Sequence, residues 1–122
     1  MTDINNRIDI DIILRSFYQK LLLDKRIAYI FTDVAKIDLE KHLPIIGDFW
    51  EMVLFHTGNY QKNVLRIHQD LNQQSPLTKE HFQIWLYNFN LTIDELYQGD
   101  NATIAKQRAQ SVATVMQIKF TQ

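Results

Sequence analysis

Hydrophobic residues recur at intervals of three and four along most of this sequence, the spacing that gathers side chains on one side of an α-helix. No run shows the convincing alternation of apolar and polar residues that is typical of a half-buried strand. The chain has only 3 Gly and 2 Pro to interrupt helices. The pattern therefore predicts an all-α protein.

The first predicted helix is the segment "IDIILRSFYQKLLLD", residues 10–24. Its apolar stripe consists of Ile13, Leu14, Phe17, Tyr18, Leu21 and Leu22. We expect Asp24 and the charged residues after it to end this helix. A shorter helical piece, "IAYIF" at residues 27–31, follows.

The next predicted helix lies within "DLEKHLPIIGDFWEMVLF", residues 38–55, and Gly58 comes just beyond its end. The side chains expected to share one side of this helix are His42, Ile45, Ile46, Phe49, Met52 and Val53. Pro44 cannot donate a hydrogen bond to the carbonyl of Glu40 and would crowd it. We therefore expect a loose turn over residues 38–43, with the regular helix starting near Pro44.

Three further helices are predicted in the second half of the chain. A polar loop, "TGNYQKN", leads into the short helix "NVLRIHQDL" at residues 63–71. Thr78 is the expected N-cap of a long helix that Gly99 ends, with a buried side of Phe82, Trp85, Phe89, Ile93 and Leu96. The last helix spans roughly residues 101–120 and carries Ile104, Ala105, Arg108, Val112, Val115 and Met116.

Length and composition narrow the function classes. A chain of 122 residues has the length of a single domain, which we expect to span residues 1–122. The net charge of -1 and the scattered Lys and Arg residues argue against nucleic acid as a partner. The longest apolar run is five residues and "MTDINNR" is no signal peptide, so we expect a soluble, cytoplasmic protein with no membrane partner.

The absence of cysteine removes thiolate metal sites and leaves the four histidines as the main metal-ligating candidates. His68 shares a helix side with Val64, Leu65 and Leu71. A buried imidazole there would be neutral, with one nitrogen able to accept a hydrogen bond or to bind a metal. The commoner arrangement is a core histidine bonded to a backbone carbonyl. We do not expect a dedicated zinc site, because no HExxH motif or pair of histidines at helical spacing occurs.

Three more residues place a polar tip on an otherwise apolar helix side: Tyr18, His42 and Trp85. Each alone is most simply an aromatic core residue whose polar atom reaches a backbone acceptor. Four such residues in one small helical core, His68 included, would be explained together by a flat apolar cofactor. That cofactor would be a haem held by one imidazole, with hydrogen-bond donors on its far side.

The sequence also resembles the group III truncated haemoglobins over almost its whole length. The matching residues are Phe17–Tyr18, Asp24, Ile30–Phe31, His42–Leu43, Asp48–Trp50, Tyr60 eight residues before His68, and "HFQIWL" at residues 81–86. The resemblance implies a truncated globin fold, a two-over-two helical sandwich. In it, helices near residues 11–23 and 42–57 would cross helices near residues 78–97 and 102–119.

The resemblance also implies a set of functional residues around haem b (iron protoporphyrin IX). His68 would be the proximal iron ligand, and Tyr18, His42 and Trp85 would stabilise the bound ligand on the distal side. Phe31 would pack against the porphyrin. The cofactor-binding residues expected in addition to these are Leu43, Phe49, Tyr60 and Arg66. Tyr60, Lys62 and Arg66 lie where they could reach the haem propionates, although each could equally be a solvated surface residue.

Three functional classes remain open from the sequence. The first is a haem protein that reversibly binds dioxygen or another diatomic ligand, as an oxygen carrier does. The second is a haem enzyme that dioxygenates nitric oxide or reduces peroxide. It would need a separate reductase, because the chain has no Gly-rich dinucleotide-binding motif. The third is a cofactor-free helical interaction module.

Overall fold

The computed structural model describes residues 1–57, 68 and 71–120, and all its regular elements are helical. They are α1 (Arg7–Leu23), α2 (Lys25–Tyr29), the π-helix η1 (Ile30–Val34), α3 (Leu39–Phe55), α5 (Lys79–Leu96) and α6 (Asp100–Phe120). His68 and residues 71–74 are helical as well. The predicted all-α class is confirmed.

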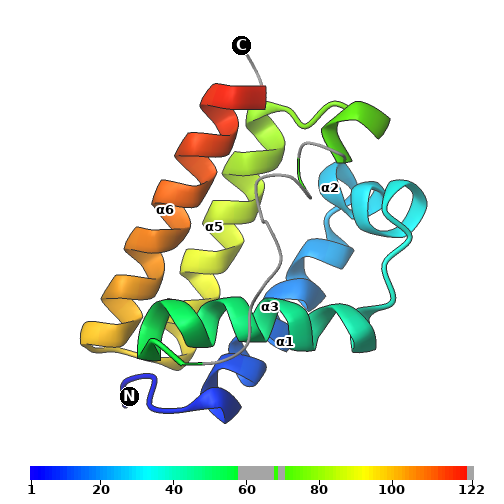
Figure 1. The fold of residues 1–122 in the computed structure, drawn as a ribbon. Coiled ribbons are helices and arrows are strands. Elements are labelled where there is room, and N and C mark those ends of the chain that lie inside the picture. The colour runs from blue at the N-terminus through cyan, green and yellow to red at the C-terminus, as the bar shows by residue number, and fades with distance from the viewer. Residues whose placement is uncertain (58–67, 69–70, 121–122) are drawn as a thin grey trace.

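The helices form two pairs that cross. α5 and α6 lie side by side and antiparallel, while α3 runs across them with α1 next to it (Figure 1). α1 contacts both α3 and α5, and α3 also contacts α6. This is the two-over-two arrangement expected from the resemblance. Among the described residues, no helix is long and apolar enough to cross a membrane.

α1 begins one turn earlier than predicted because Asn6 caps it, accepting a hydrogen bond from the backbone N–H of Asp9 at 3.1 Å. The predicted stripe is confirmed and extended by Ile10, except that Leu22 is only half-buried. Asp24 ends α1 and caps α2, because its carboxylate accepts from the N–H of Arg26 at 2.9 Å.

The predicted start of α3 is wrong, because the helix begins at Leu39 and includes Pro44. Asp38 supplies the N-cap that the prediction overlooked, accepting from the N–H of Glu40 at 3.1 Å. The guanidinium of Arg7 also donates to the carbonyl oxygen of Pro44 at 2.9 Å. The cap and this contact from α1 stabilise the first turns although the proline nitrogen donates nothing.

The buried side of α3 also differs from the prediction by about one residue. The fully buried residues are Leu43, Gly47, Trp50 and Leu54, whereas the predicted set is half-buried or exposed. Gly47 explains the difference. It has no side chain to add to an apolar stripe, yet its bare backbone lets the Arg7 guanidinium lie directly against α3. The helix therefore has a core-facing side and an adjacent half-buried apolar side that includes Ile46, Phe49 and Val53.

The residues named for α6 are buried only in part: Ala105 and Met116 are buried and Val112 is half-buried. Ile104 and Val115 are 43% and 48% exposed, and Arg108 is exposed too. The side that packs inward is made of Ala102, Ala105, Ala109, Ala113 and Met116. Small side chains allow two helix backbones to approach closely, which a search for large apolar residues misses.

α5 follows the prediction closely. Thr78 caps it, and Phe82, Phe89 and Ile93 are buried, while Trp85 and Leu96 are half-buried. The helix ends at Leu96 rather than at Gly99. Gly99 has a φ of 149° and lies against the Asp3 side chain, a position that a Cβ atom could not share.

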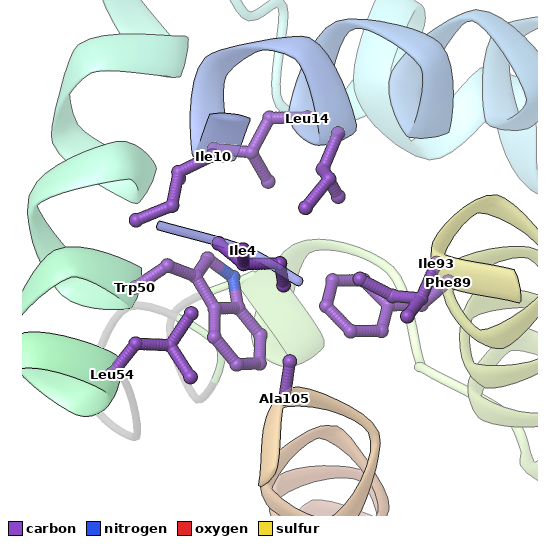
Figure 2. Close-up of a pocket in the computed structure, with 9 residues that line it drawn as sticks. Ile4, Ile10, Leu14, Trp50, Leu54, Phe89, Ile93 and Ala105 are labelled. Atoms are coloured by element: carbon purple, nitrogen blue, oxygen red, sulfur yellow. The ribbon is translucent and has the colours of Figure 1, made fainter. Parts of the chain in front are cut away.

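Aromatic rings fill the centre of the core. Phe89 stacks on Trp50 with ring centroids 4.8 Å apart and meets Phe17 edge-on at 5.3 Å. A void of about 10 Å³ remains beside Trp50 and Phe89, with Ile4 from the N-terminal segment closing one side (Figure 2). Its walls are apolar, so a water molecule there would find no hydrogen-bond partner.

Candidate functional site

A buried hydrogen bond joins two of the predicted site residues. Tyr18 comes from α1 and His42 from the second turn of α3, and Tyr18 Oη lies 2.9 Å from His42 Nε2. The two rings are perpendicular, with centroids 5.4 Å apart. Tyr18 is only 5% exposed and His42 is half-buried. The crossing of α1 and α3 therefore places a phenol and an imidazole together at the edge of the core.

Burial sets the protonation of this pair. It raises the pKa of Tyr18 well above its usual value, so the phenol keeps its proton at neutral pH. Burial also lowers the pKa of His42, and the charge of His68 lowers it further. Both side chains are thus neutral near pH 7, so Tyr18 keeps its hydroxyl proton beside an uncharged imidazole.

His68 belongs to the same region of the molecule. It is helical and half-buried, and its effect on the pKa of His42 is a repulsion between two imidazolium charges. Such repulsion requires the two side chains to be near each other. The structure therefore places Tyr18 against His42, and the charge of His68 acts on His42 from a third helical segment.

Aromatic residues line this region. Phe31 meets Tyr18 edge-on, with ring centroids 5.6 Å apart. The π-turn of η1 presents Phe31, since the N–H of Ala35 bonds to the carbonyl of Ile30 at 2.8 Å, five residues back. Trp85 is linked to Tyr18 through the ring of Phe17. The ring centroids of Trp85 and Phe17 are 5.7 Å apart, and those of Phe17 and Tyr18 are 5.3 Å apart.

The remaining predicted site residues are placed differently. Leu43 lies in the buried core at 7% exposure, and Phe49 is half-buried with its ring 5.3 Å from that of Trp50. Tyr60, Lys62 and Arg66 lie outside the described residues, as do Val64 and Leu65, which the sequence analysis expected on the same helix side as His68.

The surroundings fit a haem better than a bare metal ion. Several apolar side chains are only partly buried while packing against the core: Phe31, Leu39, Ile46, Phe49, Val53, Leu71, Trp85 and Leu86. A flat apolar cofactor would cover such a surface, and an imidazole such as that of His68 suits an iron porphyrin. Over the ranges that the structure describes, no three His, Asp or Glu side chains come together as a protein-only metal site needs.

One pair of residues was missed by the sequence analysis. His81 is buried at 7% exposure, and its Nε2 lies 3.1 Å from Tyr29 Oη. His81 is the third residue of α5, and its backbone and side chain complete a capping box with Thr78. The sequence indicated Thr78 as the cap but not His81 as its partner, because the usual residue at that position of a capping box is Glu or Gln.

Comparison with known proteins shows that the chain is similar to truncated haemoglobins. No protein-family model matches it. The group 3 truncated hemoglobin ctb of Campylobacter jejuni is 31% identical over 108 residues, which cover 86% of this chain and 83% of that protein. The crystal structure of a group III truncated hemoglobin from Campylobacter jejuni superimposes with a TM-score of 0.87 at 28% identity, covering 98% of this chain and 95% of that one.

Proposed function

Because the chain belongs to the group III truncated haemoglobins, we propose that it binds haem b and that His68 is the residue that would ligate the iron. The function that follows is reversible binding of dioxygen or another diatomic ligand. Tyr18, His42 and Trp85 are the residues that we propose to stabilise this ligand.

The observation that carries the proposal is the hydrogen bond between Tyr18 and His42. The charge of His68 lowers the pKa of this same His42 imidazole. A ligand-binding haem site needs one imidazole for the iron and polar hydrogen atoms on the opposite side. A cofactor-free packing module has no need for two neighbouring imidazoles and a buried phenol in an apolar surround, where burying polar groups costs free energy.

Haem, when bound, would supply an iron atom able to bind a diatomic ligand. The chain supplies the surroundings. Tyr18 offers a phenol O–H that burial keeps protonated, and Trp85 offers an indole N–H. In a site with little water, each such hydrogen bond stabilises a polar ligand by about 1 kcal/mol.

The same surroundings keep water away from the cofactor. In this proposal Phe31 and Phe49 provide apolar contact to the porphyrin, and Leu43 supports them from the core. Tyr60 and Arg66 are the proposed partners of the propionates. This assignment rests on the family resemblance and on the chemistry of an O–H donor and a guanidinium toward carboxylates.

Titration of the purified full-length chain with hemin tests the proposal. We expect uptake of one hemin per chain and an absorption spectrum that changes in the variant His68→Ala. Added free imidazole should restore the original spectrum in that variant, because it replaces the missing ligand. His56→Asn is the matched control, since His56 is exposed at the end of α3 and has a φ of 59° that asparagine tolerates. An unchanged spectrum in His68→Ala would contradict the proposal.

A further inference from the structure

The Tyr29–His81 contact joins two walls of the proposed haem site. Tyr29 is the last residue of α2 and directly precedes η1, which presents Phe31. His81 lies on α5 one turn before Trp85. The two rings pack with centroids 5.7 Å apart, in addition to the 3.1 Å contact between Tyr29 Oη and His81 Nε2. One side-chain pair therefore connects the segment of Phe31 to the helix of Trp85.

The hydrogen bonds of His81 determine which ring nitrogen carries the proton. The backbone N–H of Thr78 donates to Nδ1 at 3.1 Å, and an N–H can donate only to an unprotonated nitrogen. The neutral imidazole must therefore carry its hydrogen on Nε2, which then donates to Tyr29 Oη. Thr78 Oγ1 accepts from the backbone N–H of His81 at 3.2 Å, which fixes the backbone at the same point.

We propose that His81 is a positioning residue of the haem site: its Nε2–H tautomer holds the Phe31 segment against the helix that carries Trp85. This inference rests on the proposed haem binding. The side chain of His81 bonds to Thr78 and Tyr29, whereas the proposed ligand residues Tyr18 and His42 bond to each other. Its effect on the cofactor is exerted through Tyr29 and through the first turns of α5.

A simpler role would be that His81 only caps α5. The two roles differ in what Tyr29 contributes, because the cap is complete without the phenol. Removing the Tyr29 hydroxyl leaves both Thr78–His81 hydrogen bonds in place. A pure cap would therefore be insensitive to Tyr29→Phe, whereas a positioning residue would not.

Hemin loss to an apomyoglobin scavenger provides the first test, with Tyr29→Phe compared with Tyr97→Phe. Tyr97 also donates one hydrogen bond, to Asp9 at 3.0 Å, but from the opposite end of α5. Each variant thus loses one phenol hydroxyl and one hydrogen bond. We expect hemin loss to be about 3- to 10-fold faster in Tyr29→Phe and unchanged in Tyr97→Phe. Equal rates in the two variants would overturn the inference.

Ring ¹⁵N shifts of His81 in the full-length chain provide the second test, which does not depend on hemin. We expect the Nε2–H tautomer, with a shift at Nε2 in Tyr29→Phe and none in Tyr97→Phe. A proton on Nδ1 would overturn the inference while leaving haem binding intact. A chain that takes up no hemin would instead refute the proposed function and, with it, the positioning role.

Discussion

Tyr18 shows how position in the fold determines the chemistry of a side chain. A phenol on the surface exchanges hydrogen bonds with water, but Tyr18 is enclosed by Phe17, Phe31 and His42. Its polar atom has one described partner, His42 Nε2, and burial raises its pKa, so that it stays a donor. A donor fixed in this way loses little freedom when a ligand arrives, which is why we assign it a main role in retaining the ligand.

Replacing Tyr18 with phenylalanine should speed the release of dioxygen by about 5- to 10-fold, the equivalent of one lost hydrogen bond. Rapid mixing of the oxygenated protein with a competing ligand measures this rate. Tyr87→Phe is the control, since Tyr87 lies on the outer side of α5 at 67% exposure. An unchanged rate in Tyr18→Phe would remove Tyr18 from the ligand site. Slower peroxide turnover in this variant would favour the redox alternative.

Single residues were more readily predicted from the sequence than their contacts. Tyr18, His42, His68 and Trp85 stood out because each puts a polar tip into an apolar helix side. That His42 bonds to Tyr18 could not be read from the sequence, because the contact joins residues 24 positions apart and depends on how α1 crosses α3. His81 did not stand out, since its role as a cap partner does not alter any apolar pattern.

At the scale of elements, α6 depends on a residue far away in the sequence. The carboxylate of Asp3 accepts from the backbone N–H groups of Asn101 and Ala102, both at 2.9 Å, and from that of Ile4 at 2.8 Å. Desolvation raises the pKa of Asp3, but these N–H donors outweigh it and hold the pKa below its usual value. The N-terminal segment thus caps the last helix of the chain.

The variant Asp3→Asn should lower the free energy of unfolding by about 1 kcal/mol at pH 7. The folded-state pKa of Asp3 is depressed, so its contribution is present above the unfolded value near 4 and is lost as pH falls through the lower folded value. Urea unfolding at pH 7 and pH 3 measures this, and the gap between variant and wild type should shrink at pH 3. Asp33→Asn, at an exposed position, is the control. A gap that stays constant with pH would contradict the account.

Over the residues that the structure describes, the helical type of the elements was predicted well, but the side of each helix that faces the core was predicted less well. Large apolar residues indicated α1 and α5 correctly because those helices pack with large side chains. The same approach found only Ala105 and Met116 of the buried side of α6, where most inward residues are alanines, and it failed for α3, where Gly47 faces inward. It also failed at Pro44, where the Asp38 cap and Arg7 outweigh the missing proline donor.

For the whole molecule, the crossing of the two helix pairs has its centre at Phe89. This residue is 1% exposed, and its ring contacts Phe17 from α1, Trp50 from α3 and Trp85 from its own helix. Core and proposed site therefore share a wall, since Trp85 belongs to both. Helical periodicity alone predicts neither how the two helix pairs cross nor that Trp85 belongs to both the core and the proposed site. The family resemblance implied the crossing.

Phe89→Ala should lower the free energy of unfolding by about 3–5 kcal/mol, because it enlarges the adjacent void and removes three ring contacts. Urea unfolding with and without hemin measures the loss. Leu91→Ala, on the outer side of α5 at 36% exposure, should cost far less. Similar losses in the two variants would show that the core is not organised around Phe89.

The visible absorption spectrum of the purified wild-type protein, recorded oxidised, reduced and reduced under carbon monoxide, tests haem binding most directly. The account predicts an intense porphyrin band that shifts on reduction and shifts again when carbon monoxide binds. A colourless protein that also remains unchanged after hemin is added would contradict it.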